Sequence, residues 1–378
     1  MERKKITILM LHLQYGGIEK QTITFANELS KKYAVEIISI YSMNKEPAYP
    51  IDKNIKIKYL INDEPNRSQF RDAIKSKNII KIVKEGLKAV KILYLKKKLM
   101  IQEIKNLDTN FAFSTRVEYA NMLSKYAPNG IIKITEEHLH NNSKKYIRKI
   151  KNAFKNIDFL ITIGKGSTEN YSKWLEKNKK IKIVEIPNIL EYVPKERASL
   201  DKYNIISVGR LHEIKDFPTL VRVFNMVQKE INDARLTIVG DGGEYNNIIK
   251  LINELNLTEK VTMTGMVTKN EVEKYMLDSD LYVMTSLTEC FPMVLLEAFS
   301  VGLPVISFDV PVGPMAIIEN EQNGYLIENR NETEMAKKII EIFRDREKLK
   351  KFGINAKESS MQYLPEKIMN KWYEIFDN

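Results

Sequence analysis

The chain has 378 residues, 43% of them hydrophobic and 29% charged, which is the composition of a globular protein long enough for two domains with separate cores. A single small domain is excluded. An intrachain disulfide is excluded because Cys290 is the only cysteine, and no run approaches the roughly 18 to 20 apolar residues that a membrane span requires. The apolar part of the first segment, MERKKITILML, is too short for a signal peptide, so we expect a cytoplasmic protein.

The net charge of +11 is unevenly distributed along the chain. Residues 1–190 contain 37 Lys and Arg against 19 Asp and Glu, whereas residues 191–378 contain 23 against 30. A basic half indicates a nucleic acid, an anionic membrane surface or an anionic polymer as partner. The sequence has no zinc-finger, RNP or basic-zipper signature, so we expect no nucleic-acid partner and favour the membrane or the polymer.

The first half predicts alternating strands and helices. Strands are expected at residues 6–11, 35–41, 55–60, 111–115, 131–136, 158–163 and 181–186, and helices at 18–29, 69–106, 117–126 and about 164–178. Gly16 and Gly17 stand between the first strand and the first helix, where glycines can let backbone N–H groups approach a diphosphate. From these residues alone, an ordinary tight strand–helix turn is the favoured interpretation.

The predicted helix over residues 69–106 is lysine-rich. Ten lysines and only two acids, Glu85 and Glu103, lie between residues 75 and 105, while apolar residues recur there at three- and four-residue steps. One interpretation is attachment to an anionic leaflet, and the other is a helix whose apolar face packs on the sheet while its lysines are solvated. The basic first half of the chain favours the membrane.

His138 and His140 follow the strand predicted at residues 131–136. They therefore lie at the carboxyl edge of the sheet, where ligands bind in open α/β folds. Either one could donate to a sugar hydroxyl or a phosphate oxygen, and either could be an ordinary surface residue. No metal site is expected, because the chain has only four histidines and neither an HExxH motif nor a Cys/His set.

The second half begins after a linker of little periodicity near residue 190. Strands are expected at residues 205–208, 236–239, 261–264, 281–285 and 304–308, and helices from about 218 and at 293–299. Arg210 and Lys215 follow the first of these strands and are suited to a diphosphate, although surface cations on a loop are common. The later GDGGE segment is interpreted as a plain strand–helix turn, and Asp278-Ser279-Asp280 as a helix end and strand start rather than a metal motif.

Glu289 and Glu297 bracket the start of the helix predicted at residues 293–299. The helix N-terminus offers free N–H groups to an anion, and two carboxylates separated by a loop can face one bound molecule from two directions. The alternative is a pair of solvated acids near a helix dipole.

The segment ECFPMVLLE, from Glu289 to Glu297, resembles the E-x7-E motif of the retaining GT-B glycosyltransferases of family four, also called glycosyl transferases group 1, of the bacterial cell-surface polysaccharide type. The similarity extends to Gly16-Gly17, to SVGRLHEIKDF and to PVGPMAII. It implies an α/β GT-B fold in which two Rossmann-like, doubly wound parallel-sheet domains face each other across a cleft. Residues 1–189 would form the basic acceptor-side domain, residues 190–360 the nucleotide-sugar domain, and residues 361–378 a helix that crosses back to the first domain.

The resemblance also assigns donor-binding roles. Arg210 and Lys215 would bind the diphosphate and act in catalysis, with Gly16, Gly17 and the N–H groups of the helix start also facing the donor. These N–H groups belong to Phe291, Met293 and Val294. Backbone atoms of Met266 and Val267 would pair with the base, and Glu297 would hold the ribose.

Two further catalytic roles follow from the same resemblance. Glu289 would accept from a hydroxyl of the transferred sugar, and a Glu-His pair that contacts this sugar favours His138, preceded by Glu137, over His140. Ala316 departs from the pattern, which often has a glutamate there. No metal or other cofactor is expected.

The function implied is retaining transfer of a hexose or N-acetylhexosamine from a UDP-sugar to a hydroxyl of a lipid-linked or polymeric glycan, in the assembly of a capsule, teichoic acid or similar polymer. The protein would act in the cytoplasm, at the inner face of the plasma membrane. Two alternatives remain: a non-enzymatic nucleotide- or glycan-binding partner, and a sugar phosphorylase or nucleotide-sugar epimerase on the same fold.

Overall fold

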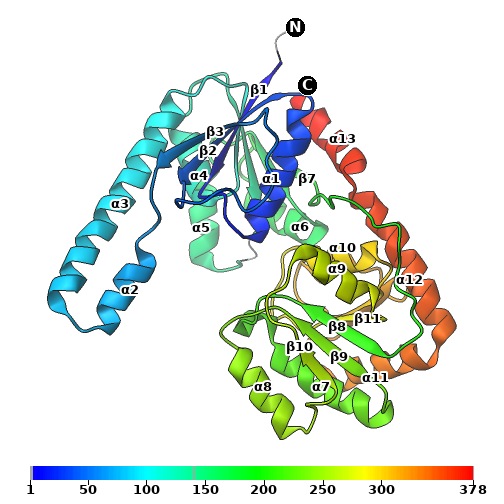
Figure 1. Ribbon diagram of the computed structural model, residues 1–378. Coiled ribbons are helices and arrows are strands. Elements are labelled where there is room, and N and C mark those ends of the chain that lie inside the picture. The colour runs from blue at the N-terminus through cyan, green and yellow to red at the C-terminus, as the bar shows by residue number, and fades with distance from the viewer. Residues whose placement is uncertain (1–2, 139–140, 378) are drawn as a thin grey trace. The chain divides into compact units, whose positions relative to one another are not determined.

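The computed structural model describes residues 3–138 and 141–377, which form two compact units. The N-terminal unit contains the chain up to Ile163, the segment Thr168–Ile186 and the chain end from Tyr373 (Figure 1). The C-terminal unit contains Gly164–Ser167 and Pro187–Trp372. Among the described residues, no helix is both long enough and apolar enough to cross a bilayer.

The N-terminal unit is built on a seven-stranded parallel sheet with the strand order β3-β2-β1-β4-β5-β6-β7. Its strands are β1 Lys5–Met10, β2 Ala34–Tyr41, β3 Lys56–Ile61, β4 Phe111–Ser114, β5 Ile132–Glu137, β6 Phe159–Thr162 and β7 Lys182–Glu185. Strands β1 and β4 are neighbours although a long segment separates them in sequence. The strand order therefore reverses between them, and such a point is where open α/β sheets bind ligands.

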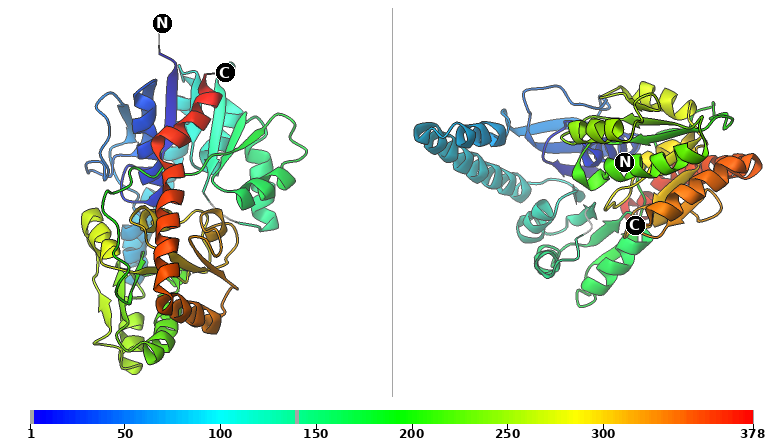
Figure 2. Two further views of the ribbon diagram at one scale, coloured as in Figure 1. Left: turned by 90° about the vertical axis from the view of Figure 1, so that its right-hand side faces the viewer. Right: turned by 90° about the horizontal axis from the view of Figure 1, so that it is seen from below.

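Six helices follow or join these strands, and one predicted helix is divided. They are α1 Gly17–Ser30, α2 Arg67–Lys75, α3 Ile79–Lys105, α4 Val117–Tyr126, α5 Lys144–Ala153 and α6 Lys165–Trp174. The prediction of one continuous helix over residues 69–106 is wrong, because Lys77 adopts a left-handed conformation (φ 54°) and Asn78 caps a new helix by accepting from the Lys81 N–H. Helices α2 and α3 form a hairpin that extends away from the sheet (Figure 1 and Figure 2).

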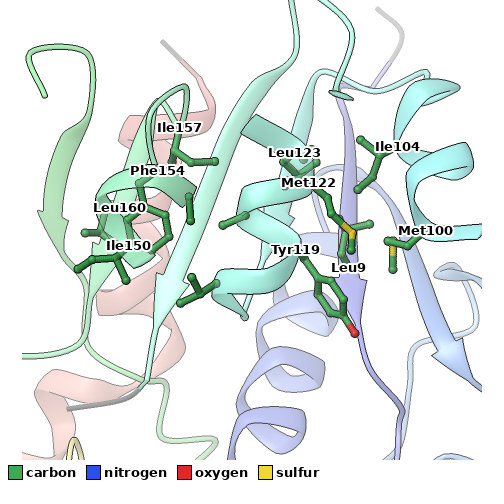
Figure 3. Close-up of a cluster of buried hydrophobic side chains, with 14 of the residues drawn as sticks. Leu9, Met100, Ile104, Tyr119, Met122, Leu123, Ile150, Phe154, Ile157 and Leu160 are labelled. Atoms are coloured by element: carbon green, nitrogen blue, oxygen red, sulfur yellow. The ribbon is translucent and has the colours of Figure 1, made fainter. Parts of the chain in front are cut away.

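One apolar core connects the sheet with the helices on one of its faces. Figure 3 shows Leu9 of β1 facing Met122 and Leu123 of α4, with Met100 and Ile104 of α3 on the other side. On the other face, Phe376 at the end of α13 (Pro365–Phe376) is fully buried and packs edge-on against Phe111, with 4.9 Å between ring centroids. The last residues of the chain are therefore part of the N-terminal unit's core.

The C-terminal unit repeats the doubly wound plan with six parallel strands in the order β10-β9-β8-β11-β12-β13. The strands are β8 Asn204–Val208, β9 Arg235–Val239, β10 Val261–Met263, β11 Leu281–Met284, β12 Val305–Phe308 and β13 Gly324–Ile327. Its helices are α7 Phe217–Glu230, α8 Tyr245–Glu254, α9 Lys269–Leu277, α10 Met293–Ser300, α11 Glu332–Arg344 and α12 Arg346–Ser360, with short 3-10 turns η1 Glu213–Lys215, η2 Pro314–Ala316 and η3 Met361–Tyr363. The predicted fold class, two Rossmann-like parallel-sheet domains, is confirmed, and the strand order of this sheet reverses between β8 and β11.

Candidate functional site

The loop that follows β8 carries the two predicted diphosphate ligands. Arg210 is exposed, and within the described part of the chain its guanidinium makes no hydrogen bond or ion pair. The glycines of the GDGG segment pack under this loop, since a Cβ added at Gly240 would lie 2.0 Å from the carbonyl oxygen of Gly209, and one at Gly242 would lie 2.2 Å from that of Leu211. GDGG is therefore explained by close backbone packing, as the plain-turn interpretation requires.

Lys215 and Glu289 form an ion pair between the loops after β8 and β11. The Lys215 Nζ lies 2.5 Å from the Glu289 Oε1, and the Ser286 hydroxyl donates to the same oxygen at 2.8 Å. The Glu289 carboxylate is nearly buried, with 12% of its side chain exposed. Two residues 74 positions apart in sequence thus meet because β8 and β11 are neighbours where the strand order reverses.

Arg330 fixes the same two loops to each other. Its guanidinium donates to the Asp216 carboxylate at 2.7 Å and to the carbonyl oxygens of Thr285 and Ser286 at 2.9 and 3.1 Å. It also lies over the ring of Phe308, 4.2 Å from the centroid. Asp216 in turn caps α7. Arg330, which follows β13, therefore connects its own loop with the loops after β8 and β11. Sequence reasoning missed this cation, because no motif or spacing distinguishes Arg330 from a surface residue.

The helix α10 begins at Met293, as predicted. Pro292 precedes it and no side chain caps it, so the N–H groups of its first turn, those of Met293 and Val294 among them, have no intrahelical partner. Phe291 is buried beside Tyr363, and Glu297 is half-buried within the helix. The helix thus presents free donors at the carboxyl edge of the sheet.

Tyr282 of β11 shows that the two motif glutamates share one environment. Its hydroxyl donates to the Val208 carbonyl oxygen at 3.0 Å. Burial raises the pKa of Tyr282, and the negative charges of Glu289 and Glu297 raise this pKa further. The charges of both carboxylates therefore reach the junction of β8 and β11. Val208, at this junction, lies two residues before Arg210.

The PVGP segment packs directly against Glu289. Glu289 and Val312 form a parallel β-bridge, and a Cβ added at Gly313 would lie 2.5 Å from the Cβ of Glu289. Only glycine fits there without displacing the glutamate. The resemblance includes this stretch but does not predict that it supports Glu289.

Met266 and Val267 lie at the carboxyl end of β10, the edge strand. Gly265 before them has a positive φ of 70° and accepts a hydrogen bond from the Gly240 N–H, while Thr268 after them begins α9 with a capping box. The Met266 side chain is 80% exposed. These residues are held on the same edge as the β8 and β11 loops, which leaves their assigned role in base binding a prediction.

In the N-terminal unit, His138 directly follows β5. Its Nε2 lies 3.0 Å from the Glu136 carboxylate. Burial alone would lower the pKa of His138, but the charge of Glu136, with those of Glu137 and Glu19, outweighs it and raises the pKa above its ordinary value. His140 lies outside the described residues.

The predicted strand end at residue 136 is wrong by one residue, and Glu137 belongs to β5. The Glu137 carboxylate is buried and accepts hydrogen bonds from the hydroxyls of Tyr146 and Tyr171. Burial raises the pKa of Glu137 despite these bonds. The acid that directly contacts His138 is therefore Glu136, and the contact of His138 with the transferred sugar stays a prediction.

Gly16 and Gly17 precede and begin α1. A Cβ added at Gly16 would lie 2.1 Å from the Glu19 carboxylate, whereas none of the described atoms lies within 4 Å of one added at Gly17. Glu19 is buried and pairs with Arg116 at 3.2 Å, and burial lowers the pKa of the neighbouring His12. Gly16 thus makes room for an internal carboxylate that sequence reasoning missed.

The Asp278-Ser279-Asp280 segment is a helix end and strand start, as predicted. Helix α9 ends at Leu277, and the buried Asp280 accepts from the backbone N–H groups of Lys202 and Asn204 at 2.9 and 2.8 Å. Across residues 3–138 and 141–377, no three His, Cys, Asp or Glu side chains are grouped so that they could hold a metal ion.

Comparison with known proteins shows that the chain is similar to glycosyltransferases. Residues 188–359 match the family model described as glycosyl transferases group 1. The match covers most of the C-terminal unit, which is therefore similar to the glycosyl transferases of group 1. The chain is 28% identical over 377 residues to an uncharacterized glycosyltransferase of Haemophilus influenzae, a match that covers 98% of this chain and 99% of that protein.

Three other comparisons extend this result. The chain is 27% identical to the N-acetylgalactosamine-N,N'-diacetylbacillosaminyl-diphospho-undecaprenol 4-alpha-N-acetylgalactosaminyltransferase of Campylobacter jejuni, with 92% of each chain covered. Its fold is similar to that of Staphylococcus aureus TarM in complex with alpha-GlcNAc-glycerol and UDP, with a TM-score of 0.77, 17% identity, and coverage of 99% of this chain and 100% of that one. It also matches an exopolysaccharide phosphotransferase of Streptomyces coelicolor at 24% identity, but spans only 40% of that protein's length.

Proposed function

We propose that this protein is a glycosyltransferase that moves a hexose or N-acetylhexosamine from a UDP-sugar to a hydroxyl of a lipid-linked or polymeric glycan during the assembly of a cell-surface polymer, with retention of the anomeric configuration. The observation that carries the proposal is the junction of β8 and β11. Arg210, whose guanidinium has no partner among the described residues, shares one sheet edge there with the Lys215–Glu289 ion pair and the first N–H groups of α10. Cations and free donors at this edge suit a diphosphate.

The donor's diphosphate is the proposed ligand of Arg210 and Lys215. When the bond between the anomeric carbon and the diphosphate oxygen breaks, the leaving UDP gains negative charge, and preorganised cations and N–H donors stabilise that charge. Arg210 offers a planar fork of donors, and the N–H groups of Met293 and Val294 add fixed dipoles. Glu297 would accept from the ribose hydroxyls, and Met266 and Val267 would face the base.

Glu289 is the proposed ligand of the transferred sugar. Its Oε1 is occupied by Lys215 and Ser286, while its Oε2 accepts no hydrogen bond within the described part of the chain. A carboxylate held by one oxygen can orient the other toward a sugar hydroxyl. We infer a front-face route, in which the acceptor hydroxyl attacks the anomeric carbon and passes its proton to the leaving phosphate. This route needs no metal or other cofactor.

The proposed acceptor class rests on the basic N-terminal unit and on the names of relatives. The Campylobacter jejuni relative is named for a diphospho-undecaprenol substrate. A Staphylococcus aureus relative, 33% identical over 45% of this chain, is named poly(ribitol-phosphate) alpha-N-acetylglucosaminyltransferase. One name indicates a lipid-linked acceptor and the other an anionic polymer, and both fit a basic surface.

A panel of UDP-sugars, tested with lipid-diphosphate and polyol-phosphate acceptors, checks the proposal. We expect one donor to yield UDP in step with acceptor glycosylation, the product to keep the donor's anomeric configuration by NMR, and turnover to persist in EDTA. Release of UMP would instead indicate transfer of a sugar phosphate, the reaction class named for the Streptomyces coelicolor relative. UDP binding without turnover of any donor would favour a binding protein. Conversion of a UDP-sugar into its epimer without release of UDP would favour an epimerase, and formation of a sugar 1-phosphate from a glycan and inorganic phosphate would favour a phosphorylase.

A further inference from the structure

The α2–α3 hairpin exposes a row of apolar side chains. Ile80, Val83, Leu87, Val90 and Tyr94 of α3 are between 55% and 80% exposed. The sequence left open whether this face packs on the sheet, and the structure shows that it does not. The part of α3 that enters the core is a different face, formed by Ile92, Met100 and Ile104.

The exposed residues form one continuous stripe. They follow one another at steps of three, four, three and four residues, so they lie on one side of the helix. From Ile80 to Tyr94 the stripe is about 21 Å long at the helical rise of about 1.5 Å per residue. Exposed apolar surface of this extent on a folded chain indicates a binding surface.

A row of lysines runs parallel to the stripe. Lys81, Lys84, Lys88 and Lys91 each follow one stripe residue, which places them about 100° around the helix from it. All four are exposed, and within the described part of the chain their side chains make no hydrogen bond or ion pair. The exposed surface of this helix therefore combines apolar and purely cationic rows.

The two acids of α3 do not neutralise these lysines. Glu85 accepts a hydrogen bond from Asn66 at 3.3 Å, and Glu103 pairs with Lys58 at 2.6 Å. Both are thus engaged by neighbouring elements of the N-terminal unit. A second copy of the hairpin would bring lysines against lysines with no acidic counterpart, although the three-four spacing alone would suit a coiled coil.

We propose that the α2–α3 hairpin docks the protein on an anionic lipid surface, with the stripe in the headgroup and acyl boundary and the lysine row at the phosphates. An anionic membrane offers both an apolar interior for the stripe and a layer of negatively charged phosphates for the lysine row. Because buried residues of α3 anchor it and α2 packs along it, the stripe is formed before binding. This docking is independent of the proposed reaction, since it needs neither nucleotide nor acceptor.

Co-sedimentation of the full chain with vesicles tests the docking. Vesicles of phosphatidylcholine with about a third phosphatidylglycerol should bind the protein at near-physiological salt, and pure phosphatidylcholine vesicles should bind it at least about tenfold more weakly. Equal binding to both, or to neither, overturns the proposal. No nucleotide is added, so this result does not depend on transfer activity.

Two surface variants locate the binding. The triple variant Lys84→Glu, Lys88→Glu, Lys91→Glu and the double variant Leu87→Ser, Val90→Ser should each weaken vesicle binding at least about tenfold. All five positions are exposed, so the fold is not at risk, and circular dichroism checks it.

A matched control carries the same charge change on another basic surface of the same unit, as Lys155→Glu, Lys177→Glu, Lys179→Glu. It should bind vesicles as the unmodified chain does, and an equal loss in the control would show unspecific attraction and overturn the assignment. Light scattering without vesicles tests the remaining alternative, in which a second copy of the chain binds the stripe. A dimer that Leu87→Ser, Val90→Ser dissociates would show that the stripe joins two copies instead.

Discussion

At the scale of single residues, Lys215 and Glu289 have different proposed roles: Lys215 binds the diphosphate, and Glu289 binds the transferred sugar. We expect Glu289→Gln to lower the rate of sugar transfer about 100-fold, because the sugar loses a charged acceptor, while UDP affinity is kept because Lys215 is freed from its partner. Lys215→Met should instead weaken UDP binding about tenfold, since it removes a cation from the diphosphate. Calorimetry with UDP and initial-rate kinetics measure the two effects.

The exposed Lys229 on α7 gives the control for this pair, and Lys229→Met should change neither quantity. Were Glu289→Gln to weaken UDP binding as much as Lys215→Met, the two side chains would serve one function, and the assignment of Glu289 to the sugar would be wrong.

His138 gives a pH-dependent prediction in the N-terminal unit. Its folded-state pKa is raised above 6.5 by Glu136 against the effect of burial. A raised histidine pKa adds stability that is fully present below the unfolded-state value and is lost as the pH rises through the folded-state value. The stability difference between the unmodified chain and His138→Gln should therefore be larger at about pH 6 than at about pH 9.

Urea unfolding followed by the fluorescence of Trp174, in a Trp372→Phe background, measures this difference within the N-terminal unit. The variant His212→Gln, in the C-terminal unit, is the control and should leave the unfolding of the N-terminal unit unchanged. A difference that stays constant over this pH range would mean that folding does not shift the pKa of His138, and a difference that is smaller at pH 6 would mean that folding lowers this pKa.

Among the sequence elements, the segments with local signals were predicted and those defined by distant contacts were not. Strand β11 and helix α10 agree with the prediction to within a residue, because a short apolar run and Pro292 mark them. Strand β13 was missed, since GYLI has only four residues and forms only by pairing with β12. The candidate site shows the same division: the E-x7-E pair is visible in sequence, whereas Arg330 is recognised only through its contacts.

The PVGP loop is an element whose geometry decides the position of a catalytic candidate. We expect Gly313→Ala to lower the transfer rate about tenfold to 100-fold, because the added methyl group must displace Glu289 and a shift of about 1 Å is costly in an active site. Gly243→Ala is the matched control, since no described atom lies within 4 Å of its added Cβ. An unchanged rate in Gly313→Ala would show that the position of Glu289 is not critical for transfer.

At the scale of the whole molecule, each unit has its own sheet and core, and the last helix belongs to both. Helix α13 begins within the C-terminal unit, but its residues from Tyr373 onward belong to the N-terminal unit. Lys32 pairs with Asp377 at 2.6 Å, and Phe376 packs on Tyr33 and Phe111. The resemblance implied a helix within residues 361–378, but not which side chains it buries.

We therefore expect two separable unfolding transitions in differential scanning calorimetry. Saturating UDP, at about 100 times its Kd, should stabilise only the C-terminal unit, by about 2.7 kcal/mol, because the proposed ligands of its diphosphate are there. Phe376→Ala should lower only the free energy of unfolding of the N-terminal unit, by about 3 to 5 kcal/mol, because it leaves a cavity in the core of that unit. If UDP and Phe376→Ala moved the same transition, the two units would unfold as one, and α13 would be the element that couples them.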